Sequence, residues 1–374
     1  MTPSRYVRFQ PRTRLPRPYT PREFRGAWWL PGPHSQTLAG HFLRRSEGVC
    51  YRRERLDTAD GDFLDLDFAV VNNSSLWSSD APVALLLHGL EGSSRSPYVR
   101  ATCRTLAERG IRAVVMNYRS CSGEMNRLPR FYHGGETADL AWVLAHLAGR
   151  FAGVPIVGIG FSLGASILLN YLGAEGERAG FRAAVAVSVP FDLGEGERKL
   201  YRSPMGRVYM RLLLRSLAEK YALKRDVLGA LCDEDAVLAA RRFREFDTAL
   251  TAPLHGFRDA EDYYLRASCA PALGCVRVPT LLIHAMNDPF VAEETIPAAA
   301  IHENPFVFGA VVEEGGHVGF IAGGTPLRPV FWGEEETARF LAVQLGIDEH
   351  AYPSTLGAAG TTPAGTTAAA EGGG

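Results

Sequence analysis

The sequence has little lysine, little cysteine and no long hydrophobic run. Only three of its 374 residues are lysines, and the formal net charge of −1 does not favour nucleic acid as a general partner. The six cysteines are scattered without a C-x-x-C pair, which excludes a small disulfide-stapled domain and predicts reduced thiols in a cytoplasmic protein. No stretch approaches 18 apolar residues and no secretory signal is present, so no membrane span is predicted.

Motifs for common metals and cofactors are also absent. The sequence contains no H-E-x-x-H motif, and no G-x-G-x-x-G follows an early strand with an acidic residue at the proper distance. The sequence therefore predicts a protein that needs neither a metal ion nor a cofactor.

The two ends of the chain differ in composition from the rest. Residues 1–25 contain seven arginines, several prolines and a single acid, Glu23, which predicts a disordered arm. Trp28 and Trp29 follow, and this pair predicts the start of the folded body. Residues 351–374 are low in complexity and predict a disordered tail. Basic arms attract anionic lipid, but proline disfavours an amphipathic helix, so a solvated arm is expected rather than membrane attachment.

Between these ends, predicted strands and helices alternate. Leu64, Leu66 and Phe68 alternate with Asp65 and Asp67, the pattern of a half-buried strand. Continuous apolar runs then predict strands covered on both faces, at Val83–Leu87, Ile111–Met116, Val154–Ile159, Ala183–Ser188, Thr280–His284 and Val307–Val312. Helical patterns lie between the strands, at about Tyr98–Glu108, Glu136–Ala148, Leu163–Leu172 and Glu335–Gln344. This order predicts an α/β fold with a mostly parallel, doubly wound sheet.

One interval interrupts the alternation. Residues 190–275 contain no predicted buried strand, but they carry helical patterns at Met205–Tyr221 and Asp233–Phe246. The interval is too long for a crossover loop and predicts a helical cap over the C-terminal edge of the sheet. The α/β core would then comprise residues 26–189 and 276–350.

A G-x-S-x-G motif identifies a candidate nucleophile. Gly160-Phe161-Ser162-Leu163-Gly164 lies between a predicted buried strand and an amphipathic helix. A serine on such a tight turn needs flanking glycines, because Cβ atoms would clash there. Ser162 is therefore the predicted nucleophile of a serine hydrolase. The alternative is a glycine-rich turn with a capping serine, which the strand before the motif and the helix after it disfavour.

A second glycine-rich turn, His88-Gly89-Leu90-Glu91-Gly92, follows the strand Val83–Leu87. In hydrolases built on a serine turn, one oxyanion donor is the N–H after the nucleophile and the other comes from the loop after the third strand. The sequence therefore predicts the backbone N–H groups of Leu90 and Leu163 as an oxyanion hole. His88 precedes Ser162 and is expected to organise its loop.

The general base is expected after Ser162, because the chain order in such hydrolases is serine, acid, histidine. His317 follows the last strand on the glycine turn Gly315–Phe320, where it can present Nε2 to a serine and Nδ1–H to an acid. The other histidines after Ser162 are His255, His284, His302 and His350. His284 lies within an apolar strand and is expected to be a satisfied core histidine.

Two aspartates are candidates for the acid. Asp288 follows the strand Thr280–His284, and Asp192 follows the strand Ala183–Ser188, so both lie at carboxyl ends of strands, where active-site loops gather. Asp288 occupies the strand just before the histidine turn and is favoured. Asp192 can instead cap the first helix of the predicted cap.

Several segments together resemble the AB hydrolase-4 family, whose YheT-like members are predicted esterases. The matching segments are Pro33–Leu38, Asp60–Asp67, His88–Tyr98, Ser120–Thr137, Gly160–Leu163, Ser188–Leu193, Thr251–Tyr264, Leu281–Phe290 and Gly315–Phe320. The resemblance spans about residues 28–345 and implies a carboxylic-ester hydrolase with the triad Ser162, Asp288 and His317. The segment Gly164-Ala165-Ser166 departs from the Gly-Gly-Asn that the family more often has.

The loop of residues 119–137 has two interpretations. Its polar residues follow a predicted strand at the active-site edge, so they can face the substrate or satisfy the loop's own backbone. Cys121 lies in this loop, but no strand–turn–helix presents it as a nucleophile.

The sequence favours hydrolysis of a small-molecule carboxylic ester, a class that includes lipid-like esters. Two alternatives remain open: the same triad in an acyltransferase, thioesterase or phospholipase, and a non-catalytic binding protein on a hydrolase fold. Oligomeric state is not predicted.

Overall fold

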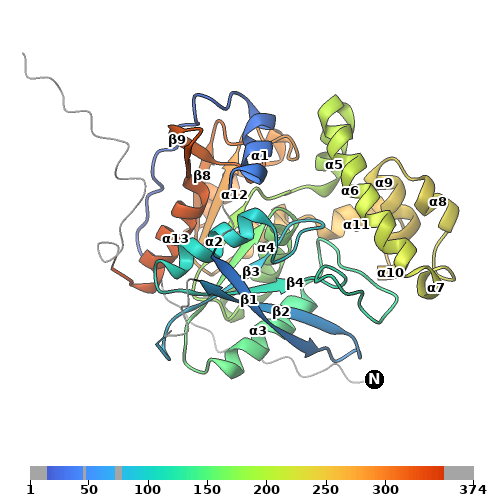
Figure 1. Ribbon diagram of the computed structural model, residues 1–374, viewed down its shortest axis with the longest axis horizontal. Helices are drawn as coiled ribbons and strands as arrows, with labels where there is room; N and C mark the ends of the chain where they lie inside the picture. The colour runs from blue at the N-terminus through green and yellow to red at the C-terminus, as the bar shows by residue number, and fades with distance from the viewer. Residues whose placement is uncertain (1–14, 45–47, 72–77, 349–374) are drawn as a thin grey trace, which may run out of the picture.

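The computed structural model describes residues 15–44, 48–71 and 78–348, and an eight-stranded sheet forms its centre (Figure 1). The strands lie in the order β1-β2-β4-β3-β5-β6-β7-β8. They are β1 Val49–Asp57, β2 Phe63–Val71, β3 Val83–Leu87, β4 Arg112–Asn117, β5 Ile156–Phe161, β6 Ala184–Val187, β7 Thr280–Ala285 and β8 Val307–Val312. β2 pairs antiparallel with β1 and β4, and every later pair is parallel. The predicted mostly parallel sheet is confirmed.

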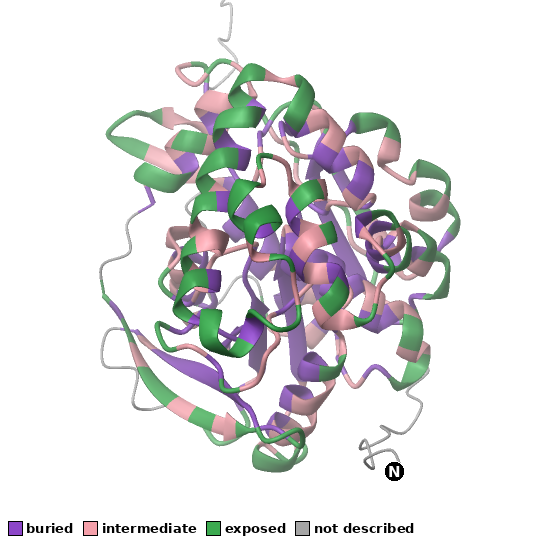
Figure 2. Cartoon of the chain, turned by 90° about the vertical axis from the view of Figure 1, so that its right-hand side faces the viewer, coloured by how far each residue is buried: buried purple, intermediate pink, exposed green. Residues whose placement is uncertain are grey.

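Helices cover both faces of the sheet because the central strands are apolar on both sides. Leu85 of β3 points into the apolar cluster that contains α3 (Ala138–Arg150) and α4 (Leu163–Glu175). Its neighbour Leu86 points into the opposite cluster, with α2 (Pro97–Ala107) and α13 (Trp332–Leu345). Successive side chains of a strand alternate between faces, so a continuous apolar run feeds two cores. Figure 2 shows these strands as the buried centre of the molecule.

The predicted strand at β2 is present, but it is buried on both faces and not half-buried. Asp65 and Asp67 are each only 1% exposed. Arg55 and Arg53 of β1 donate paired hydrogen bonds to them at 2.7–2.9 Å, directly across the antiparallel register. The arginines of the neighbouring strand cover and neutralise the carboxylates, which allows both faces of β2 to be buried.

Helices without any strand fill the chain between β6 and β7. They are α5 Leu193–Arg202, α6 Pro204–Leu223, α7 Arg225–Leu228, α8 Glu234–Ala239, α9 Phe243–Phe246, the π-helical turn η2 Asp247–Thr251, α10 Ala252–His255, α11 Ala260–Ala267 and the 3₁₀ turn η3 Ala270–Cys275. The expected helix over Asp233–Phe246 is two short helices, because the backbone is extended at Ala240 (ψ 129°). Figure 1 places these helices together at one side of the sheet.

Several elements were not predicted from the sequence. The helix α1 (Pro33–Phe42) precedes the sheet, and β9 (Ile321–Thr325) and β10 (Arg328–Phe331) form a separate antiparallel pair. The remaining short elements are the helix α12 (Ala298–Glu303) and the 3₁₀ turns η1 (Gly176–Arg178) and η4 (Glu293–Thr295). Within the described ranges, no helix is both long and apolar enough to cross a membrane.

The prediction of a disordered arm over residues 1–25 is wrong for the part that the structure describes. Tyr19 donates a 2.6 Å hydrogen bond to Glu336 of α13, and its ring meets Phe340 edge-on at 4.9 Å. The ring of Phe24 lies 5.2 Å from that of Trp332. Two aromatic side chains thus anchor this segment to α13. Its high content of proline and arginine predicted disorder because that content says nothing about these two contacts. Trp28, the expected first buried residue of the body, is instead 80% exposed. Residues 1–14 and the predicted tail lie outside the described ranges.

Candidate active site

Ser162 occupies the turn between β5 and α4, as predicted. Its backbone has φ 50° and ψ −119°, a strained conformation for a residue with a side chain. A Cβ on Gly160 would lie 2.5 Å from the Gly164 carbonyl oxygen, and one on Gly164 would lie 2.5 Å from the Leu87 carbonyl oxygen. Both glycines are therefore required for helix α4 to start this close to the strand ends.

The structure brings Ser162, His317 and Asp288 into one chain of hydrogen bonds. His317 Nε2 lies 3.0 Å from Ser162 Oγ, and His317 Nδ1 lies 2.8 Å from Asp288 Oδ2. Asp288 is fully buried, and its other carboxylate oxygen accepts the backbone N–H of Phe290 at 2.7 Å. With Nδ1–H facing a carboxylate, the imidazole presents a lone pair to the serine hydroxyl.

Residues that sequence reasoning missed hold the histidine in place. The backbone N–H of His317 donates to Thr37 Oγ1 of α1 at 2.9 Å, and the ring of Phe290 stacks on the imidazole with centroids 4.3 Å apart. Thr37 lies in the segment Pro33–Leu38, whose resemblance to the hydrolase family was the one signal that this stretch matters.

The alternative candidates for the acid and the base either lie away from Ser162 or have another structural role. Asp192 caps α5 by accepting the Glu195 N–H at 2.8 Å, which is the structural role considered for it. His302 is exposed on α12, and His350 lies outside the described residues. His284 is buried as expected, but neither ring nitrogen has a hydrogen-bond partner in the described chain. Burial lowers the pKa of His284 to about 4, so its ring is neutral at physiological pH.

The glycine-rich loop after β3 lies against Ser162. A Cβ on Gly89 would stand 3.3 Å from the Ser162 Cβ. The N–H of Leu163 is the first of α4 and has no partner within the helix. The N–H of Leu90 has no acceptor among the described residues either, so both predicted donors are free. His88 organises the loop, since its Nδ1–H donates to the Gly89 carbonyl at 2.8 Å and its Nε2 accepts the Tyr118 N–H.

Residues 84–328 match the model of a family described as the alpha/beta hydrolase family. The chain belongs to this family. It is 40% identical over 316 residues to YheT of Escherichia coli (strain K12), a match that covers 83% of this chain and 91% of the relative. It is 35% identical over 301 residues to "Phospholipase ABHD3" of Mus musculus, covering 79% of this chain and 72% of the relative. The resemblance to the AB hydrolase-4 family is thereby confirmed.

Two further proteins are similar to this chain. "Monoacylglycerol lipase" of Saccharomyces cerevisiae is 35% identical over 280 residues, which cover 73% of this chain and 62% of that protein. Among solved structures, the Pyrococcus furiosus esterase Pf2001 matches with a TM-score of 0.51 and 16% identity. That match covers 88% of this chain and 97% of the esterase chain, and it shows a shared fold.

A cavity of about 340 Å³ opens beside Ser162 and His317. Most of its lining comes from residues 190–275. Its apolar wall includes Leu193, Leu200, Leu213, Phe246, Leu250 and Leu254. The apolar wall suits a hydrocarbon chain better than a charged group.

The helix α6 is tied to the loop that carries Leu90. Glu91, only 4% exposed in its side chain, accepts a hydrogen bond from Lys220 Nζ at 2.7 Å and another from the Ser216 hydroxyl. The Tyr132 hydroxyl donates to the same carboxylate at 2.9 Å and accepts the Glu91 N–H at 2.7 Å. Glu91 has a φ of 56°, so these contacts hold the loop in a conformation that side-chain-bearing residues rarely adopt.

Both interpretations of the loop 119–137 apply, to different residues. Arg119 binds Asp139 at 2.6 and 2.7 Å and Asp62 at 2.8 Å, all buried, so it stabilises the loop itself. Phe131, Tyr132 and His133 line the cavity instead. Cys121 is no rival nucleophile, because burial raises the pKa of its thiol to about 11.

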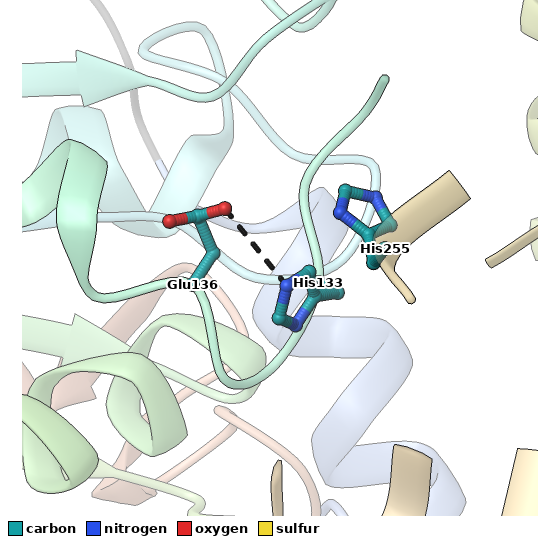
Figure 3. Close-up of side chains that lie close together, drawn as sticks. All are labelled: His133, Glu136 and His255. Carbon is teal, nitrogen blue, oxygen red and sulfur yellow. Dashed lines mark ion pairs between the residues drawn. The ribbon is translucent and has the colours of Figure 1, made fainter. Parts of the chain in front are cut away.

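His133, Glu136 and His255 form a polar cluster, and both histidines also line the cavity (Figure 3). Burial lowers the pKa of His133 to about 4 and that of His255 to about 3. His133 Nδ1 accepts the Gly135 N–H at 3.1 Å, so the neutral ring carries its proton on Nε2, which faces Glu136 at 3.8 Å. Glu136 is itself paired with Arg130. His133 and His255 thus add polar groups to a largely apolar cavity wall.

Proposed function

We propose that the protein is a serine hydrolase that cleaves carboxylic esters through an acyl-enzyme. The observation that carries this proposal is the chain of hydrogen bonds from Ser162 through His317 to Asp288, which faces a largely apolar cavity. The names of two relatives, a phospholipase and a monoacylglycerol lipase, support esters as the substrate class.

In the proposed reaction, Ser162 Oγ attacks the acyl carbon while its proton passes to His317 Nε2. The bond to the leaving alcohol then breaks, and His317 returns the proton to the leaving oxygen. Water attacks the acyl-enzyme with His317 again as the base, which releases the carboxylic acid and restores Ser162. Asp288 orients the imidazole and stabilises its charged form. The N–H groups of Leu90 and Leu163 donate to the tetrahedral oxyanion.

The relatives also support a lipid ester as one form of the substrate. The apolar side chains along α6 and η2 can bury an acyl chain, and each buried methylene stabilises binding by about 0.8 kcal/mol. We therefore expect the specificity constant to rise with acyl length until the cavity is filled. An alcohol in place of water as the acyl acceptor would make the same machinery a transferase.

The test is a series of p-nitrophenyl esters from acetate to dodecanoate, run with Ser162→Ala. We expect the variant to lose about three or more orders of magnitude in kcat on every ester. The matched control is Ser166→Ala, a buried serine on the next turn of α4 whose hydroxyl donates to the Pro190 carbonyl. The control should retain activity and fluorophosphonate labelling.

Retained turnover in Ser162→Ala would exclude Ser162 as the nucleophile. Absence of labelling in well-folded wild-type protein would favour the non-catalytic alternative. Formation of ethyl esters in added ethanol, at the expense of free acid, would identify a transferase.

A further inference from the structure

Helices α1 and α6 flank the cavity, and each adds a second row of side chains that faces solvent. On α1, Thr37 and His41 line the cavity. Leu38 and Phe42 come one position later on the helix, about 100° further around it, and are 40% and 75% exposed. Exposed apolar side chains of this size, paired at i and i+4, form a stripe on the helix surface.

The same arrangement recurs on α6. Leu213 and Leu217 line the cavity, whereas Val208 and Leu212 point to solvent and are 46% and 62% exposed. The two helices are in contact, since His34 Nδ1 lies 3.2 Å from the Tyr209 hydroxyl. Figure 1 places α1 and α6 on the same side of the molecule. On each helix the exposed apolar stripe therefore adjoins residues that line the cavity.

Positive charge lies next to the stripe on α6. Arg207 and Arg211 are exposed, one helical turn apart, and neither is paired with a carboxylate in the described chain. Arg215 continues the row but is paired with Glu219 at 3.0 Å. Arg207 donates only to the Tyr201 carbonyl, at 3.1 Å, so its charge is not neutralised. An apolar stripe beside arginines that lack a carboxylate partner is the pattern of a helix that lies in a membrane interface, where apolar side chains enter the acyl region and cations meet phosphate.

We propose that the stripes Leu38–Phe42 and Val208–Leu212, with Arg207 and Arg211, dock the protein on an anionic lipid bilayer. In this orientation the cavity between α1 and α6 faces the lipid, so an ester can enter without crossing water. The inference rests on the proposed function only for that route of entry, because docking itself needs no catalysis.

A second copy of the chain fits the surface less well. In a symmetric contact the same patch meets itself, so the arginine rows of both copies would come together. The acid within the row, Glu219, is already paired with Arg215. Anionic lipid supplies the missing negative charge.

The experiment is co-sedimentation of the full chain with large vesicles. One set contains a 1:1 mixture of phosphatidylglycerol and phosphatidylcholine, and the other contains phosphatidylcholine alone. We expect binding to the anionic set and much less to the neutral set. Leu212→Asp and Phe42→Asp should each lower binding about tenfold, because each replaces an inserted apolar group with a charge. Arg207→Glu with Arg211→Glu should abolish the preference for anionic vesicles.

Leu238→Asp is the matched control. Leu238 is 53% exposed on α8, which Figure 1 shows at the far side of the helical region from α1. This variant should bind like wild type. All variants keep residues 1–25, so binding through the basic N-terminal segment would persist in each of them. Turnover of a short soluble ester without vesicles checks that every variant is folded, and it tests the proposed catalysis separately.

Any one of four outcomes would overturn the proposal. Wild-type protein would fail to bind the anionic vesicles, or would bind both vesicle types equally. The aspartate variants would bind as tightly as wild type. Sedimentation velocity without lipid would reveal a dimer that Leu212→Asp dissociates, which would assign the surface to a second copy.

Discussion

The side chain of Ser162 owes its position to a strained backbone. Its φ of 50° costs about 1–3 kcal/mol, and the surroundings must supply that energy. They do so through the Ser162 N–H, which donates to the Val187 carbonyl of β6 at 2.9 Å, and through α4, which begins at the next residue. Strain at this one residue keeps the hydroxyl at the carboxyl end of the sheet.

The two aspartates that the sequence left in competition provide a residue-scale prediction. Asp288→Asn should lower kcat by roughly 10³–10⁴, because the amide offers His317 Nδ1 a donor or a weak acceptor and favours the wrong tautomer. Asp192→Ala should instead destabilise the fold by about 1 kcal/mol through loss of the α5 cap, with kcat nearly unchanged. Steady-state kinetics and urea unfolding of both variants distinguish the roles. Equal losses of kcat would contradict the assignment of Asp288.

At the scale of the element, the strands could be predicted from the sequence, but the side chains of other elements that contact them could not. The apolar runs of β3, β5, β7 and β8 are local signals, and the structure has a strand at each of them. Burial of β2 depends on arginines of another strand, and its alternating pattern gave no sign of them. The contact between α6 and the loop of Leu90 joins residues 129 positions apart, so no local pattern could reveal it.

The ion pair between Lys220 and Glu91 allows a test of that contact. Removal of either partner leaves a mostly buried group without its opposite charge, although Glu91 keeps the Ser216 and Tyr132 hydroxyls as donors. Glu91→Gln and Lys220→Met should therefore each destabilise the fold by about 1–3 kcal/mol and slow fluorophosphonate labelling. The double variant should recover part of the loss, with a coupling energy of about 0.5–3 kcal/mol. Urea unfolding and labelling rates give both quantities.

The exposed pair Arg215 and Glu219, on the same helix, is the control. Its removal should change neither stability nor labelling measurably, because exposed ion pairs contribute little. If labelling were as fast in Lys220→Met as in wild type, α6 would not influence the oxyanion loop.

The π-helical turn at Asp247 yields a prediction for pH. Burial raises the pKa of the Asp247 carboxyl to about 6, although the Thr251 and Tyr264 hydroxyls donate to it at 2.6 and 2.8 Å. The folded state then holds the proton more tightly than the unfolded state, whose pKa is about 3.8. Folded stability from this group is therefore complete below about pH 4 and decreases as the pH rises to about 6.

Asp247→Asn should remove this dependence. Relative to wild type, the variant should gain stability between pH 4 and pH 6 and keep the gain at higher pH. Thermal melts of both proteins at half-unit intervals provide the measurement. A stability difference that stays constant across this window would show that Asp247 titrates normally.

At the scale of the whole molecule, composition predicted the sheet and the helical insertion but misjudged the N-terminal segment. Local content of arginine and proline favoured disorder, whereas Tyr19 and Phe24 find their partners about 300 residues later, on α13. The candidate site was predictable because its motif, its chain order and its family resemblance all indicated Ser162, Asp288 and His317. The supporting contacts from Thr37, Phe290 and Glu91 depend on tertiary packing alone.

The anchoring of residues 15–25 leads to a prediction for global stability. Tyr19→Ala and Phe24→Ala should each lower Tm by about 2–4 °C, because each removes a half-buried ring from the surface of α13. Tyr19→Ala also removes one of the hydrogen bonds that the Glu336 carboxylate accepts, while those from Arg22 and Arg339 remain. Leu15→Ala, at a side chain that is 85% exposed, is the control and should leave Tm unchanged. Differential scanning calorimetry decides the matter. If the aromatic variants melted with the control, the segment would add nothing to the fold, and the prediction of a free arm would hold after all. If they melted earlier, α13 would be stabilised by chain that lies before the first strand, and truncation at Trp28 would yield a weaker protein.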